Sequence, residues 1–222
     1  MKYEDIKYVK ASGLATITID RQQVMNAFRS QTVEEMTSAL RDADNDESRG
    51  VVVLVGAGEK AFCTGGDQST HSGACVGRGL TGIPIEEFQA AFRDIRVPVI
   101  ARVQGYAIGG GNVIATISDL TIASEKAIFG QVGPKVSSVD PGWGTTYLRR
   151  LVGENKAHEI WYLCRRYTAA EALAMGLINA VVPHEKLDES VDQWCLEILA
   201  RSPTAIAIAK RSFNADSDHI GG

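Results

Sequence analysis

The sequence predicts an α/β fold in which buried strands alternate with helices over the first two thirds of the chain and helices alone follow. Two apolar runs rich in β-branched residues, at 51–55 and 97–103, are typical of strands buried on both faces. In the last third the apolar residues recur at helical spacing instead. With 222 residues, 45% hydrophobic and 23% charged, the chain can bury one core of its own. We therefore expect a single domain over 1–222, with an α/β core over about 1–145 and a helical region over about 146–222.

The first expected elements are a half-buried strand, a helix and a fully buried strand. Residues 14–20 alternate apolar residues with threonine, the pattern of a strand with one face in the core. Residues 32–40 carry apolar or small residues at helical spacing and lead into the charged run 41–47. We interpret this run as the solvated end of the helix. The run 51–55 then forms the buried strand.

A second unit begins with the strand at 97–103. A turn at 104–106 follows, and then a helix that opens in Gly109, Gly110 and Gly111 and ends near Ile117. The other expected elements are short strands at 120–123 and 127–129, and helices near 147–151, 156–164, 169–175, 185–200 and 204–213.

The longest irregular stretch runs from residue 69 to residue 84 and contains His71. A loop of this length in a compact domain is either a mobile binding lid or disordered, and the sequence leaves both interpretations open. A histidine can transfer protons near neutral pH, so His71 is a candidate site residue. An exposed loop histidine without a catalytic role is the alternative.

Composition excludes several classes of function. A formal net charge of -4 and a pI near 5.6, without a stripe of basic residues, provide no field for a nucleic-acid backbone. Cys63, Cys75, Cys164 and Cys195 are widely spaced, which argues against a zinc site or a disulfide framework. No segment approaches the roughly 20 apolar residues of a membrane span. We therefore expect a soluble, cytoplasmic protein without a metal, a nucleic-acid partner or a membrane partner.

Two glycine-rich turns follow the buried strands, at 62–68 and 106–112. Glycine lets the main chain approach a ligand closely, and a helix that begins at Gly110 adds the positive end of its dipole. Two N–H groups that converge on one oxygen would form an oxyanion hole. Such turns also serve tight packing or phosphate binding. Neither has the G-x-G-x-x-G order, so a dinucleotide site is disfavoured.

Together with the segments 129–135 and 172–179, the two turns make the chain resemble the crotonase (enoyl-CoA hydratase/isomerase) superfamily over nearly its whole length. The resemblance implies a ClpP-like spiral of ββα units with a helical C-terminal region that trimerises, as a homotrimer or a homohexamer. It also implies an oxyanion hole formed by the N–H groups of Gly66 and Gly110, and a coenzyme A thioester as substrate. No tightly bound cofactor is expected, because coenzyme A arrives as part of the substrate.

The chain departs from the hydratases of this family at two positions. Hydratases carry one glutamate shortly after the second glycine-rich turn and another shortly after the segment 129–131. At these two positions this sequence has Val113 and Gly133. Hydration of a double bond needs positioned acid and base groups, and neither residue can move a proton. We therefore expect that the protein is no working hydratase.

Two groups within the family resemble the chain most. 2-Ketocyclohexanecarboxyl-CoA hydrolases and, next, 1,4-dihydroxy-2-naphthoyl-CoA synthases share its residues 65–68, 130–131 and 159–161 and the pair Ser138 and Asp140. For the hydrolases the likeness extends through 61–71, 101–113, 130–135 and 202–214. The resemblance implies hydrolytic ring cleavage through a thioester enolate, with synthase-type ring closure as the alternative. A non-catalytic acyl-CoA-binding protein is the alternative from another class.

The resemblance also assigns roles to residues. The catalytic candidates are Gly66 and Gly110 for the oxyanion hole, and Ser138 and Asp140 for the attacking water. Without the family, an S-x-D pair is more often a turn or a helix cap. The glycine at 133 is expected to leave room for bicarbonate or another small anion beside Gln131 and Trp161.

The substrate-binding candidates fall into three groups. Main-chain contacts around Val24, Met25 and Ala27 are expected at the nucleotide end, since Met25 stands where the synthases carry an arginine. The family also implies further C-terminal helices that reach a neighbouring subunit, so the tail is expected to be missing here. The remaining candidates are Thr64, Gly65, Asp67, Gln68 and His71 in the first turn and its loop, Tyr106 and Gly109 in the second turn, and Gln131, Val132, Gly133 and Trp161 in the anion pocket.

Overall fold

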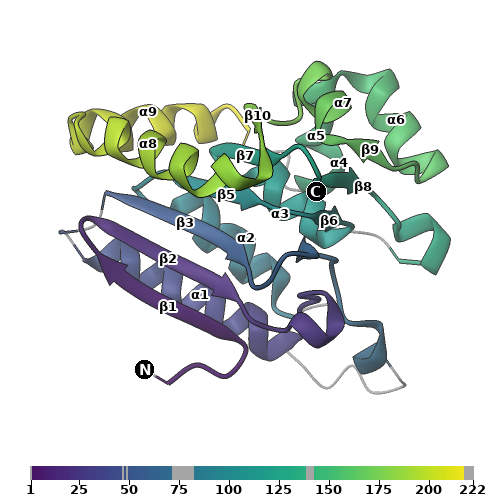
Figure 1. Cartoon of the computed structure of the whole chain (residues 1–222), viewed down its shortest axis with the longest axis horizontal. Helices are drawn as coiled ribbons and strands as arrows, with labels where there is room; N and C mark the ends of the chain where they lie inside the picture. The colour runs from purple at the N-terminus through teal and green to yellow at the C-terminus, as the bar shows by residue number, and fades with distance from the viewer. Residues whose placement is uncertain (1, 47, 49, 72–82, 139–142, 218–222) are drawn as a thin grey trace.

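The structure is a computed structural model that describes residues 2–46, 48, 50–71, 83–138 and 143–217. Its centre is a sheet of six strands in the order β1-β2-β3-β5-β7-β10 (Figure 1). β1 is antiparallel to β2, and the other neighbours are parallel. The strands are β1 Ile6–Ala11, β2 Leu14–Ile19, β3 Val51–Gly56, β5 Val99–Val103, β7 Leu120–Ser124 and β10 Ala180–Val182.

A second sheet of four short strands has the order β4-β6-β8-β9. β4 follows β3 in the chain, β6 follows β5, and β8 follows β7. Each of these three consecutive pairs therefore places one strand in each sheet. After β6 the helix α3, Gly110–Ile117, completes a ββα unit. This arrangement confirms the expected spiral of ββα units. The strands are β4 Ala61–Cys63, β6 Tyr106–Ile108, β8 Ile128–Gly130 and β9 Tyr167–Thr168.

Helices cover both faces of the large sheet, and Figure 1 shows α8 on the side opposite to α1 and α2. Alternate residues of β3 serve the two faces: Val52 and Leu54 join the core beneath α1, whereas Val51 and Val53 pack beneath α8. A strand buried on both faces must be apolar throughout, as the run 51–55 is. The early helices are α1 Ser30–Asn45 and α2 Ile85–Asp94, and the later ones are α4 Trp143–Thr146, α5 Leu148–Val152, α6 Glu154–Leu163, α7 Ala169–Ala174, α8 Leu187–Leu199 and α9 Pro203–Ala215.

Most expected elements are present, and those that the sequence did not predict have weak signals. β1 is an edge strand with only its first residue buried, so it carries little apolar alternation. The expected turn at 104–106 ends in a strand, because Tyr106 begins β6. Helix α2 buries Phe88 and Phe92, one helical turn apart, next to two buried polar side chains that dilute the pattern. Short single-turn 3-10 helices lie at η1 Gln22–Val24, η2 Gln68–His71, η3 Gly133–Val136 and η4 His184–Lys186.

Membrane-spanning helices and metal sites were both expected to be absent, and the structure bears on them only within the described ranges. No helix in the described ranges is long and apolar enough to cross a membrane. In the same ranges, no group of histidine, cysteine and acidic side chains could hold a metal ion. Cys63, Cys164 and Cys195 are all buried, and Cys75 lies outside the described residues.

Candidate active site

The two glycine-rich turns meet at the carboxyl ends of β4 and β6. A Cβ atom added to Gly65 would lie 2.9 Å from the main-chain nitrogen of Gly110, so only glycine permits this approach. Gly65 and Gly109 have φ angles of 87° and 56°, in the region that favours glycine. Phe28 links to the first turn, since its N–H donates to the Gly65 carbonyl at 2.8 Å and its carbonyl accepts from the Asp67 N–H at 2.8 Å.

Among the described residues, no group accepts a hydrogen bond from the N–H groups of Gly66 and Gly110, which leaves both for a ligand. The N–H of Gly109, in contrast, donates to the Gly130 carbonyl at 2.9 Å. Gly110 is also the first residue of α3, where the helix dipole is positive. The juxtaposed turns can therefore bind an oxygen that carries negative charge.

Beside Gly110 lies a small cavity of about 20 Å³. Val113, only 3% exposed, forms part of its wall. The described residues that line it include neither a carboxylate nor a histidine. They are Phe28, Ile85, Phe88, Gln89, Gly110, Val113, Ile114 and Ile117. The structure thus provides an apolar wall next to the second turn, and none of the described residues that line it could transfer a proton.

The segment expected at the nucleotide end of the substrate uses its own N–H groups internally. Val24 N–H donates to Arg21, Met25 N–H to Gln22, and Ala27 N–H to Val24, at 3.0 to 3.1 Å. Met25 is in the left-handed region with φ 54°, and its carbonyl accepts a hydrogen bond from the Thr64 hydroxyl at 3.2 Å. Because these N–H groups are used, the main chain of this segment can bind the substrate only through its carbonyl oxygens, each of which has a second lone pair.

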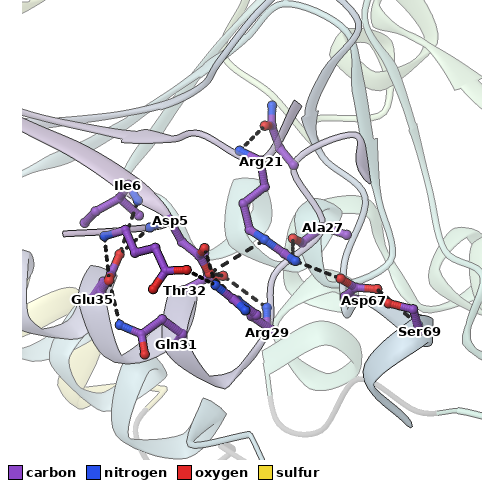
Figure 2. Close-up of polar contacts among 12 residues, drawn as sticks. Asp5, Ile6, Arg21, Ala27, Arg29, Gln31, Thr32, Glu35, Asp67 and Ser69 are labelled. Atoms are coloured by element: carbon purple, nitrogen blue, oxygen red, sulfur yellow. Dashed lines mark hydrogen bonds and ion pairs between the residues drawn. The ribbon is translucent and has the colours of Figure 1, made fainter. Parts of the chain in front are cut away.

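The first turn is attached to this segment by a buried ion pair (Figure 2). Arg21, 8% exposed, donates to Asp67 at 2.9 Å and to the Ala27 carbonyl at 2.5 Å. Asp67 also accepts hydrogen bonds from the Ser69 N–H and hydroxyl, at 3.0 and 2.6 Å. Burial raises the pKa of Asp67, but the hydrogen bonds from Ser69 and Arg21 outweigh it and hold that pKa below the ordinary carboxyl range. Asp67, only 6% exposed, is therefore a buried residue that remains a charged carboxylate.

Gly133 lies close to main-chain and ring atoms of its neighbours. A Cβ atom on Gly133 would lie 2.6 Å from the carbonyl oxygen of Ser138 and 3.1 Å from the ring of Trp161. Trp161 Nε1–H donates to the Gly144 carbonyl at 2.8 Å, so it is already engaged. The close contacts explain why position 133 tolerates no side chain, and the expected room for an anion beside Gln131 and Trp161 stays a prediction, as does the bound anion itself.

Two fully buried amide side chains lie near this region of the fold, Gln131 directly after β8 and Asn112 in the first turn of α3. Both polar atoms of each side chain lack a hydrogen-bond partner among the described residues. Such groups are costly unless water or a ligand satisfies them. Gln131 therefore keeps its expected capacity to bind a small polar molecule.

The other candidate residues divide into those that the structure places and those that it does not. Tyr106 is 43% exposed on β6. Gln68 is exposed, and its side chain donates to the Gly66 carbonyl at 3.4 Å. Ser138 is exposed and Val132 half-buried. Asp140 lies outside the described residues, and of His71 only the backbone is described, as the last residue of η2.

Sequence reasoning did not identify Arg21, which the structure places behind the first turn. Its partner Asp67 is 46 residues away in the chain. The available signal was an arginine directly after a strand and close to the candidate segment 24–27, but charged residues after strands are common. Its role depends on the tertiary structure.

Comparisons with known proteins agree with this geometry. Residues 9–221 match the family model described as enoyl-CoA hydratase/isomerase. An enoyl-CoA hydratase/carnithine racemase from Magnetospirillum magneticum is 29% identical, with a TM-score of 0.90 over 98% of this chain and 82% of that one. An enoyl-CoA hydratase from Mycobacterium avium subsp. paratuberculosis K-10 is 28% identical, with a TM-score of 0.88 over 97% and 83%. One from Bacillus anthracis is 29% identical, with a TM-score of 0.84 over 95% and 83%.

Proposed function

The chain belongs to the enoyl-CoA hydratase/isomerase family, and from this premise we propose that it hydrolyses a carbon–carbon bond of a cyclic β-keto-acyl-CoA. The observation that carries the proposal is the apolar wall formed by Val113 beside two available N–H groups. An oxyanion site whose wall is apolar at Val113, where the hydratases carry a glutamate, suits a reaction through a thioester enolate more than the addition of water to a double bond.

The proposed reaction balances as follows. Water attacks the ring ketone and loses a proton, and the resulting tetrahedral carbon expels the α-carbon. The electrons of the broken bond move into the thioester, whose oxygen becomes an enolate. A proton then adds to the α-carbon, and the product is a linear acyl-CoA with a new terminal carboxylate, as in the conversion of 2-ketocyclohexanecarboxyl-CoA to pimeloyl-CoA.

In this reaction the N–H groups of Gly66 and Gly110 stabilise the enolate oxygen, an effect worth about 3–4 kcal/mol for each donor. Ser138 and Asp140 are the proposed groups that orient and deprotonate the water. Gln131 is a further polar group that we propose for the site, because a bound ligand or water would satisfy its buried amide, which is unpaired among the described residues. Tyr106 and the segment 24–27 are proposed to contact the coenzyme A part.

A panel of three substrates tests the proposal. The protein is incubated with 2-ketocyclohexanecarboxyl-CoA, o-succinylbenzoyl-CoA and crotonyl-CoA, and the products are identified by mass spectrometry. We expect pimeloyl-CoA from the first and no hydrated product from the third. Cyclisation of the second without ring opening of the first would replace our proposal by synthase chemistry. Binding of all three without any turnover would favour an acyl-CoA-binding protein.

A variant tests the water-activating role. Asp140→Asn keeps the size of the side chain and removes its basicity, so we expect kcat to fall by about 10²-fold or more with little change in substrate affinity. Ser202→Ala, which removes the N-cap hydroxyl of α9 far along the chain, is the control. Undiminished turnover in Asp140→Asn would show that another group activates the water.

A further inference from the structure

Arg21 lies directly behind the first glycine turn, and its guanidinium contacts three parts of the chain (Figure 2). One nitrogen donates to the Ala27 carbonyl at 2.5 Å and another to Asp67 at 2.9 Å. Its Nε lies 3.6 Å from a carboxylate oxygen of Asp5. These distances join the segment 24–27, the first turn and the residue that precedes β1. The planar fork of an arginine can make such contacts at once.

The first turn is held on both sides of Gly66, and Arg21 contributes to one of them. On one side the Gly65 carbonyl accepts from Phe28, which directly follows Ala27. On the other side Asp67 is held by Arg21 and by Ser69. With both neighbours held, the peptide plane that carries the Gly66 N–H has little freedom to rotate.

We infer that Arg21 is a positioning residue, which acts through Asp67 to orient the Gly66 N–H toward the substrate oxygen. Through its hydrogen bond to the Ala27 carbonyl it also couples this orientation to the segment 24–27. The inference rests on the proposed enolate chemistry, since aim matters only where charge develops on that oxygen. Displacement of a catalytic group by about 1 Å can cost about 10²-fold in rate. Arg21 itself, 8% exposed and behind the turn, does not touch the substrate.

The same network contains an internal control. Arg29 binds Asp5 with two hydrogen bonds of 2.8 Å and Glu4 with one of 3.0 Å, but none of its hydrogen bonds and ion pairs among the described residues goes to the first turn. Arg21→Lys and Arg29→Lys are therefore the same chemical change, made once with and once without a link to Gly66. An effect that came only from the shared contact with Asp5 would appear in both variants.

Infrared spectroscopy of the bound thioester carbonyl directly measures how well the N–H groups are oriented toward its oxygen. The probe is cyclohexanecarboxyl-CoA labelled with carbon-13 at the carbonyl, which has no ring ketone and cannot be cleaved. Hydrogen bonds from Gly66 and Gly110 lower the C=O stretching frequency. We expect the full shift in wild type and Arg29→Lys, at most half of it in Arg21→Lys, and a dissociation constant within about threefold in all three.

Kinetics with 2-ketocyclohexanecarboxyl-CoA provide the second readout. We expect kcat to fall by about 10- to 100-fold in Arg21→Lys while KM changes little, and to stay within about twofold of wild type in Arg29→Lys. Should Arg21→Lys not fold, Asp67→Asn removes the same link from the other side with almost no change in volume. The double variant should lose no more than the worse single one, since both break one link.

The outcomes separate this inference from the proposed function. A full carbonyl shift in Arg21→Lys and in Asp67→Asn would overturn the positioning role while the proposed function stands. An equal loss of shift in Arg29→Lys would reduce Arg21 to a general structural role and overturn the inference. No carbonyl shift and no ring opening in wild type would overturn the proposed function, and the positioning role with it.

Discussion

The two glycine-rich turns of the candidate site are held in place by different kinds of interaction. The first turn is held by charge, through Arg21, Asp67 and the hydrogen bonds of Ser69. The second is held by apolar packing, because all eight residues of α3 are buried. We therefore expect acid to weaken the first turn, and the addition of a single methyl group to destabilise the second.

The largest expected effect is on the packed turn. A Cβ atom on Gly111 would overlap the carbonyl oxygen of Cys63, which is main chain and cannot turn away. We expect Gly111→Ala to lower the free energy of unfolding by about 3 kcal/mol, measured by urea denaturation. Gly50→Ala is the matched control, because its Cβ would meet only the flexible end of Leu199 at 2.5 Å. Equal stability of the two variants would contradict tight packing at the second turn.

The next effect separates activity from stability at the same turn. A Cβ atom on Gly110 would lie 2.6 Å from the ring of Phe28, a side chain that can shift. Gly110→Ala should therefore fold but displace its N–H, and we expect kcat for ring opening to fall by about 10²-fold. The measurement is steady-state kinetics at a temperature where circular dichroism shows the variant folded. Unchanged kcat would remove Gly110 from the oxyanion hole.

Acid should weaken the first turn. The pKa of Asp67 lies below its ordinary value of 3.8, because hydrogen bonds from Ser69 and Arg21 outweigh burial. The unfolded chain therefore binds more protons, and the stability that Asp67 contributes is complete above about pH 5 and is lost as the pH falls through the folded pKa. Urea midpoints between pH 6 and pH 3 should decline less steeply in Asp67→Asn. Parallel declines would mean that Asp67 carries no such contribution.

The smallest effect concerns a polar group within the packed region. Both polar atoms of the Asn112 side chain lack a partner among the described residues, so its replacement by leucine removes a desolvated group and no hydrogen bond that the structure describes. We expect Asn112→Leu to change the free energy of unfolding by less than about 1 kcal/mol. A loss of about 2 kcal/mol or more would show that a water or ligand satisfies Asn112 in solution.

Local pattern predicted the elements that build the site, but not the contacts that support it. The run 51–55 and the glycines before Ile117 have strong local signals, so the buried strand and helix α3 could be located from the sequence. The convergence of the two turns was expected only from the family resemblance, which places Gly66 and Gly110 in one oxyanion hole. The pairing of Arg21 with Asp67 has no local signal, because it joins segments that only the fold brings together.

The same limit applies at Gly133. A glycine in a motif indicates that a side chain is not tolerated, but not what occupies the place of that side chain. The family resemblance suggested an anion beside it, and the structure places the Ser138 carbonyl and the Trp161 ring next to it. Whether glycine leaves space or permits contact depends on residues that are distant in the sequence.

Ring opening in water labelled with oxygen-18 tests the central claim most directly. The account predicts pimeloyl-CoA with one label in the newly formed carboxylate and an intact thioester, because water attacks the ring ketone and the carbon–carbon bond breaks. Free coenzyme A with the label in a released cyclic acid would instead show attack on the thioester. That result would contradict an enolate intermediate held by Gly66 and Gly110.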